Sequence, residues 1–179
     1  DESKIINRLL KSVLPIIDSL CICDTGSTDN TIELIEIFAK DNNLAYKVLQ
    51  EPFQNFEYNR NFSLNGCSGM SDYILFLDAD MIFNIGAFNK NKLFDADSFT
   101  LLQGSDDFYN KNMRIIKNDG LSKYIGVTHE YISTPPNTKT IHLNKDELFI
   151  RDIGDGGSKT NQYERDIKLF TDYLLTDPD

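Results

Sequence analysis

Hydrophobic residues in the first half of the chain follow helical and strand-like spacing in turn. Residues 3–14 repeat apolar positions every three or four residues and end at Pro15, which predicts an amphipathic helix. The apolar run at 20–23 predicts a buried strand that breaks into a polar turn at 24–30, ahead of a second helix. The same alternation continues with a strand at 46–49, a helix at 55–64 and a strand at 73–77. Such alternation is typical of βαβ units around a parallel sheet.

The pattern changes after Asp80. Short β-like runs at 98–103, 113–116, 124–127 and 140–143 are separated by polar turns, and a final amphipathic helix is expected at 161–175. We therefore expect an α/β fold with a Rossmann-like, mostly parallel central sheet flanked by helices and with antiparallel additions in the C-terminal half. A chain of 179 residues fits one domain over residues 1–179.

Composition narrows the classes of function. A formal charge of -10 disfavours nucleic-acid binding, because that requires clustered Lys and Arg. No apolar run reaches the roughly 20 residues that span a bilayer, and the first residues do not resemble a secretory signal, so we expect a soluble, cytoplasmic protein without a transmembrane segment. The three cysteines are interpreted as reduced core residues. An acidic protein that binds an anionic nucleotide needs a local source of positive charge, such as a bound metal.

The candidate chemistry lies where two predicted strands end. Asp78 and Asp80, separated by Ala79, directly follow the strand at 73–77. Two such carboxylates can hold a hard divalent cation against a phosphate-bearing ligand, although Asp is also common in simple turns. Asp24 follows the strand at 20–23. Because ligands of parallel sheets bind beyond the carboxyl ends of the strands, we expect the three carboxylates to share one rim.

Two short motifs suggest other enzymes. Residues 23–27 are similar to the aspartic-protease signature, but a helical segment follows at once and no second copy of the motif exists. Residues 74–80 resemble the haloacid-dehalogenase phosphatases, in which Asp78 would be the nucleophile and Asp80 the acid/base. Ile82 stands where that family has Thr or Val. The phosphatase therefore stays as an alternative hypothesis.

The order of three motifs is more specific than any one of them. The loop at 24–31, Arg60 with the following residues 61–64, and the Asp78/Asp80 pair resemble the family 2 glycosyltransferases of GT-A fold. Segments 124–130 and 141–142 are similar to a later part of one subgroup, so the resemblance covers nearly the whole chain.

The resemblance implies an inverting, metal-dependent hexosyl- or N-acetylhexosaminyltransferase. It would move a sugar from a nucleotide-sugar donor, most simply a UDP-sugar, to a hydroxyl of a protein, glycan or lipid acceptor. Residues 1–80 would form the nucleotide-binding half and residues 81–179 the acceptor and metal half. The family's first strand would precede residue 1, and residues 174–179 resemble the start of helical repeats in longer relatives. A catalytically inactive sugar-nucleotide-binding module is the other hypothesis.

The resemblance also implies roles for individual residues. Glu130 is the candidate general base that deprotonates the acceptor hydroxyl. Apart from the resemblance, Lys159 lies in a Gly-rich loop that could close over the diphosphate. Simpler interpretations stay open, namely a helix cap for Asp24, an exposed helix charge for Arg60 and a packed side chain for His142. The remaining roles are nucleotide binding by Glu2, Asp24, Arg60 and Asp78, and binding of Mn2+ or Mg2+ by Asp80, His142 and Asp78.

Overall fold

Two strands and two helices form the N-terminal part of the computed structural model, which describes residues 1–157 and 161–176. The apolar stripe predicted for the first helix is real, since Ile6, Leu9, Leu10 and Val13 are all buried. β1 and β2 pair in parallel, as their connection through a helix requires. The bounds are α1 (Ile6–Val13), β1 (Ser19–Asp24), α2 (Thr31–Asp41) and β2 (Ala45–Gln50).

A larger, mixed sheet follows, in the order β3-β6-β5-β10-β4, with β9 paired to β5. In it β10 and β9 run parallel to β5, and the other pairings are antiparallel. β7 and β8 form a separate antiparallel ribbon. The bounds are α3 (Phe56–Gly66), β3 (Tyr73–Leu75), β4 (Met81–Ile85), the 3-10 helix η1 (Lys90–Asp95), β5 (Ser98–Gly104), β6 (Tyr109–Lys117), β7 (Lys123–Ile125), β8 (Tyr131–Ser133), β9 (Thr140–His142), β10 (Leu148–Asp152) and α4 (Gln162–Thr176).

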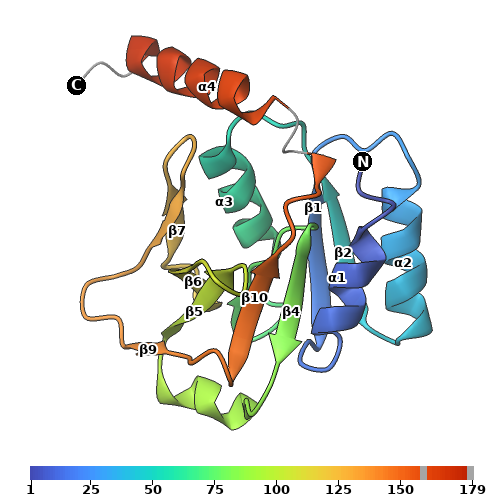
Figure 1. The fold of residues 1–179 in the computed structure, drawn as a ribbon, viewed down its shortest axis with the longest axis vertical. Helices are drawn as coiled ribbons and strands as arrows, with labels where there is room; N and C mark the ends of the chain where they lie inside the picture. Colours follow the sequence, from blue (N-terminus) through green and yellow to red (C-terminus); the bar gives the residue numbers. More distant parts are fainter. Residues whose placement is uncertain (158–160, 177–179) are drawn as a thin grey trace.

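The expected α/β fold with antiparallel additions in the C-terminal half is confirmed (Figure 1). The larger sheet is mixed because no α-helix connects its strands between residues 81 and 152, so most neighbours reverse direction through turns. The sequence pattern did not predict β4, β8 or β10. β1 and β2 also lie in a sheet of their own, separate from β3.

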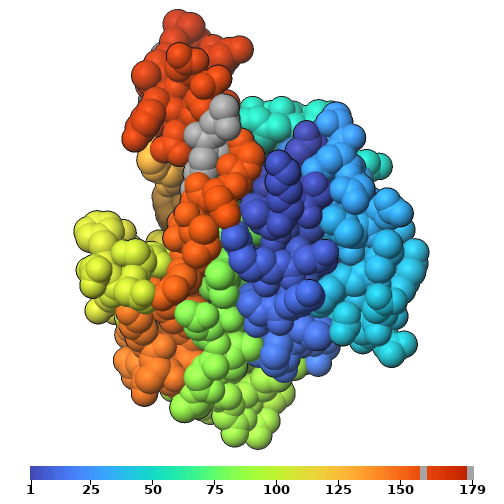
Figure 2. All heavy atoms as spheres, turned by 45° about the vertical axis from the view of Figure 1, so that its right-hand side comes forward, coloured from blue at the N-terminus to red at the C-terminus, as the bar shows by residue number. Residues whose placement is uncertain are grey.

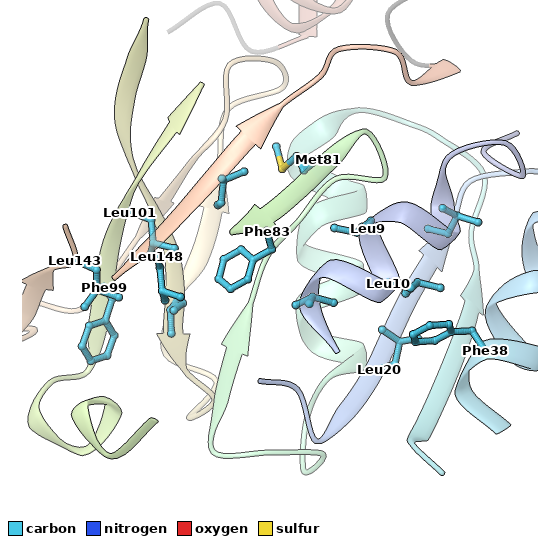
Figure 3. Close-up of a cluster of buried hydrophobic side chains, with 14 of the residues drawn as sticks. Leu9, Leu10, Leu20, Phe38, Met81, Phe83, Phe99, Leu101, Leu143 and Leu148 are labelled. Carbon is cyan, nitrogen blue, oxygen red and sulfur yellow. The ribbon is translucent and has the colours of Figure 1, made fainter. Parts of the chain in front are cut away.

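One hydrophobic core joins the two sheets. Leu10 of α1 lies on the side of Leu20 of β1, and Leu9 lies on the side of Phe83 of β4, against which α1 packs (Figure 3). The core continues under the larger sheet through Phe99 and Leu148, which are fully buried. This continuous core fixes the strand ends that carry the predicted site residues.

The C-terminal helix α4 lies at one end of the molecule (Figure 1). No side chain of α4 is buried, and Ile167 and Leu174 of its predicted apolar face are 67% and 64% exposed. Phe170 stacks on the His129 ring, with centroids 6.3 Å apart, and the Arg165 guanidinium lies over the Phe56 ring, 4.7 Å from its centroid. Residues 177–179, the end of the segment that resembles a helical repeat, lie outside the described residues.

Candidate active site

Asp24 ends β1 and is held by the turn that follows it. Its Oδ2 accepts hydrogen bonds from the backbone N–H groups of Gly26, at 3.0 Å, and Ser27, at 2.9 Å. Burial opposes the charge on this carboxyl, but the hydrogen bonds from Ser27 and Gly26 outweigh it and lower the pKa of Asp24 below its ordinary value. Asp24 is therefore an ionised, fixed acceptor, and only 6% of it is exposed.

The first two residues of the chain cover the loop after Asp24. Asp1 Oδ1 accepts hydrogen bonds from the backbone N–H groups of Thr28, at 2.5 Å, and Asp29, at 3.1 Å. The backbone N–H of Glu2 donates to Thr31 Oγ1 at 2.8 Å, and Glu2 Oε1 accepts from the Gly157 N–H at 2.9 Å. Glu2 thus connects the Asp24 loop to the segment after β10.

That segment also contacts Asp80. The backbone N–H of Ile153 donates to the Asp80 carbonyl at 3.2 Å, and a Cβ at Gly156 would lie 3.2–3.3 Å from the Asp80 side chain. Only glycine therefore fits comfortably against this carboxylate, which is 4% exposed. Figure 2 shows the segment after β10 lying beside the N-terminal residues. Lys159, the predicted lid residue, lies outside the described residues.

Arg60 brings two of the predicted carboxylates together. Its Nη1 lies 2.5 Å from Asp78 Oδ1, and its Nε donates to Glu130 Oε1 at 3.1 Å. Burial would lower the pKa of Arg60, but the charges of Asp78 and Glu130 raise it overall. The guanidinium also lies over the Tyr124 ring, 5.9 Å from its centroid, and burial raises the pKa of Tyr124 to about 12. Arg60 is therefore a permanently charged link between the two acids and not an exposed helix charge.

Local hydrogen bonds position α3 and the turn that carries Glu130. Asn55 caps α3, since its Oδ1 accepts from the Tyr58 N–H. Asn61 binds both the N–H and the carbonyl of Tyr124 in β7, and Glu57 Oε2 accepts from the Gly126 N–H at 2.6 Å. The turn needs left-handed backbone at Gly126, with φ +112°, and at His129, with φ +52°. These bonds and angles fix the distance between Arg60 and Glu130.

Sequence reasoning missed Arg114, a second cation beside Asp78. Arg114 Nη1 lies 3.8 Å from Asp78 Oδ2, and its Nε donates to Gln103 Oε1 at 2.9 Å. Gln103 Nε2 in turn donates to Asp152 Oδ2 at 3.5 Å. The sequence feature that could have pointed to Arg114 is its position as a single charged residue among the apolar residues of the strand predicted at 113–116. The site therefore has two guanidinium groups on one carboxylate.

His142 lies within the larger sheet. It lies on β9, which pairs with Ser98–Thr100 at the start of β5, whereas β10 pairs with Leu102–Gly104 at its end. Its Nδ1 lies 3.1 Å from the Thr100 carbonyl, within the sheet. No group of three His, Cys, Asp or Glu side chains suited to a metal occurs in the part of the chain that the structure describes. The role of His142 as a metal ligand beside Asp80 stays a prediction.

Comparison with known proteins identifies the class. The family model described as glycosyl transferase family 2 matches residues 1–150, so the chain belongs to this family. It is 27% identical over 143 residues to the SPbeta prophage-derived glycosyltransferase SunS of Bacillus subtilis (strain 168) and to glycosyltransferase SunS of Bacillus phage SPbeta. Each match covers 73% of this chain and 32% of the relative. The chain thus spans about a third of the length of the curated relatives it matches.

Two solved structures are also similar to this chain. They are S. aureus TarS 1-349, with 24% identity and a TM-score of 0.43, and the same protein in complex with UDP, with 22% identity and a TM-score of 0.45. The matches cover 59% and 60% of this chain and 34% of each TarS chain. Separately, none of the described helices has the length and apolar character needed to cross a membrane.

Proposed function

We propose that this chain is the donor-binding and catalytic part of an inverting, metal-dependent glycosyltransferase that uses a UDP-sugar and a hydroxyl acceptor. The observation that carries the proposal is the Arg60 link, which holds Glu130 beside the carboxylate pair that follows β3. Membership in glycosyl transferase family 2 favours glycosyl transfer over the phosphatase. The engagement of Asp78 by two arginines also argues against its use as a nucleophile.

The carboxylates of Asp78 and Asp80 suit Mn2+ or Mg2+. Both ions prefer oxygen ligands, and Mg2+ is commonly bound by one or two carboxylates together with substrate phosphates. Two side chains are therefore enough when the donor diphosphate supplies further oxygens. When bound, the cation would act as a Lewis acid that neutralises the leaving diphosphate.

The nucleotide would lie between β1 and the segment after β10. Asp24, ionised and fixed at the end of β1, would accept the N–H of a uracil ring. Glu2 and Gly157, joined by a 2.9 Å hydrogen bond, border the same space. Asp78 would face the ribose, with Arg60 behind it.

Glu130 would act as the general base. Arg60 engages its Oε1, and among the described residues no hydrogen bond to Oε2 is found. Oε2 would accept the proton of the acceptor hydroxyl, whose oxygen then bonds to the anomeric carbon as the bond to the diphosphate breaks on the opposite face. This geometry inverts the anomeric centre and leaves Arg60 to hold the base in position.

Calorimetric titration with UDP tests the donor site. We expect binding that Mn2+ tightens strongly and that weakens at least tenfold in Asp80→Asn when Mn2+ is present. Asp41→Asn, an exposed acid at the end of α2, is the matched control and should bind like the parent chain. Equal affinity with and without Mn2+, or equal binding by Asp80→Asn and the parent chain, would sink the proposal.

Hydrolysis of donors separates an enzyme from an inactive binding module. We expect the parent chain to release UDP slowly from at least one UDP-sugar, and Glu130→Gln to bind UDP normally but to lose transfer to an acceptor. A chain that binds UDP with Mn2+ yet turns over no donor, with or without candidate acceptors, would be a binding module.

A further inference from the structure

Two of the three cysteines lie against each other where α3 packs on β1. Cys21 is in the middle of β1, and Cys67 is the C-cap of α3. Cys67 belongs to a buried apolar cluster against which the half-buried Cys21 packs. A Cβ at Gly66, next to Cys67, would lie 3.5 Å from Cys21 Sγ. The fold therefore brings together two thiols that are far apart in the sequence.

Hydrogen bonding makes these two thiols unequal. The Cys67 thiol has two acceptors, the Cys21 sulfur and the carbonyl oxygen of Ser63, which lies 3.3 Å from Cys67 Sγ. Donation to Cys21 favours a thiolate there and, with the charge of Lys47, lowers the pKa of Cys21 although burial opposes it. The same hydrogen bond, together with burial, raises the pKa of Cys67. Cys21 is therefore the more nucleophilic thiol, and Cys67 stays protonated beside it.

Lys47 is held in place beside Cys21. It lies on β2, where it pairs in register with Cys21, so the two side chains are on the same face of the small sheet. Its Nζ donates to the Gly66 carbonyl at 2.7 Å, which ties the ammonium group to the end of α3. Cys23, two residues further along β1, is in a different environment, because burial and the charges of Cys21 and Asp24 raise its pKa. The chain thus contains a reactive cysteine and an unreactive one on the same strand.

We propose that Cys21 and Cys67 form a reversible oxidation site, at which hydrogen peroxide converts the two thiols into a disulfide between β1 and α3. This inference concerns the junction of these two elements and does not depend on the proposed glycosyl transfer.

The reaction has two steps. The Cys21 thiolate attacks one peroxide oxygen, the O–O bond breaks, and hydroxide leaves as Cys21 becomes a sulfenic acid. The Cys67 sulfur then attacks the Cys21 sulfur and displaces its hydroxyl group, which leaves as water with the Cys67 proton. In total the two thiols lose two electrons and two protons, and one hydrogen peroxide is reduced to two waters.

The disulfide would join two elements that carry predicted site residues. β1 ends at Asp24, and α3 carries Arg60. A bond between Cys21 and Cys67 would limit how far α3 moves relative to β1. It would also close a long loop in the unfolded chain, which lowers the entropy of the unfolded state and stabilises the folded one. Oxidation would therefore change the stability of this part of the molecule reversibly.

Peptide mapping of the parent chain tests the proposal without a mutation. The reduced chain is exposed to a small excess of hydrogen peroxide near neutral pH, alkylated, digested and analysed by mass spectrometry. We expect peptides joined through Cys21 and Cys67, an alkylated Cys23, and complete reversal by dithiothreitol. The oxidised chain should also melt at least about 5 °C above the reduced chain, because of the loop that the disulfide closes.

Three variants separate the roles of the thiols. In Cys67→Ser, oxidation of Cys21 should stop at the sulfenic acid, which dimedone traps. In Cys21→Ser, no disulfide should form within the chain, and the remaining thiols should oxidise at least about tenfold more slowly than Cys21 does in the parent chain. Cys23→Ser is the matched control, and it should form the disulfide at the parent rate.

Three results would overturn the proposal. The first is equal alkylation rates for Cys21 and Cys23 in the reduced chain, which would make Cys21 an ordinary packed thiol. The second is a set of disulfides that join only separate chains, which would show that the two sulfurs do not reach each other within one chain. The third is oxidation of Cys21 to the sulfinic acid while Cys67 stays open to alkylation.

Discussion

Arg60 is the residue through which the separate motifs of this chain meet. Its guanidinium is bound to Asp78 on one side and to Glu130 on the other, while 22% of the side chain is exposed. The sequence supported Arg60 as a direct nucleotide contact, and that prediction stays untested. The structure adds a positioning role, because a planar fork with several donors can hold two carboxylates that would otherwise repel each other.

Replacing Arg60 should therefore cost both stability and activity. In Arg60→Met, Asp78 and Glu130 lose their shared cation, and we expect a loss of about 2 kcal/mol in the free energy of unfolding. This is less than the roughly 3–5 kcal/mol for breaking a fully buried pair, because the site is partly exposed. Urea denaturation measures the loss.

Two further variants test whether the loss of stability comes from the pairing of Arg60 with the two acids. Arg60→Lys keeps the charge but cannot bind both acids as a fork, so its loss of stability should be smaller. Adding Glu130→Gln to Arg60→Met removes one of the two negative charges that repel each other, and it should recover part of the lost stability. The assignment would fail if Arg60→Met were as stable as the parent chain.

At the scale of elements, the turn between β7 and β8 decides where Glu130 lies. Gly126 has a φ of +112°, and a Cβ there would lie 3.2 Å from the Thr128 carbonyl oxygen and 3.3 Å from Glu130 Cα. Gly120 also has positive φ, at +75°, but a Cβ there would meet no atom within 4 Å. Alanine at either position would strain the left-handed backbone, but only alanine at Gly126 would also push neighbouring atoms aside.

We expect Gly126→Ala to destabilise the fold more than Gly120→Ala does. Both variants should lose about 1–2 kcal/mol from the left-handed backbone, and Gly126→Ala should lose more because of its close contacts. Only Gly126→Ala should also reduce transferase activity, because it shifts Glu130 away from Arg60. Urea denaturation and donor turnover measure the two effects, and equal behaviour of both variants would contradict the explanation.

The sequence was most informative about helices, because a helix is formed by residues that are close together in the chain. Helical spacing predicted α1 and α2, whose buried apolar residues fall on one face, and α3 was also expected although its buried residues are Asn59 and Leu64. β10 was missed because Leu148, Phe149 and Ile150 form a short apolar run whose partners, β4 and β5, lie far away in the chain. The separation of β1 from β3 was equally hidden, because strand spacing carries no information on which edges meet.

The same limit applies to the site. The strand-end rule correctly indicated that Asp24 and Asp78 emerge from strands, and the order of motifs indicated their family. The role of His142 stays a prediction, because its strand, β9, was expected from the sequence but the pairing of β9 with the start of β5 was not. Arg114 was overlooked because its partner Gln103 lies on the neighbouring strand, a pairing set by register.

Across the whole molecule, negative charge exceeds positive charge, and the arginine side chains are already paired with carboxylates. The formal charge is -10, and each of the five arginines forms an ion pair with a carboxylate. Arg8 is held by Asp155 at 2.6 Å, and the pKa of that carboxyl is lowered by the Arg8 hydrogen bond. A diphosphate that approaches without a divalent cation therefore meets net repulsion.

This balance predicts an unusual salt dependence for UDP binding. Without metal, raising NaCl from about 0.1 M to about 1 M shortens the screening length from about 10 Å to about 3 Å, so weak UDP binding should become stronger. With saturating Mn2+, binding should be far tighter, and chelation with EDTA should return it to the metal-free value. Competition against a fluorescent UDP analogue measures both series, with Asp80→Asn as the variant that should ignore Mn2+. Metal-free affinity that falls as salt rises would show instead that free basic side chains attract the diphosphate, and the dependence on a cation would then lose its electrostatic basis.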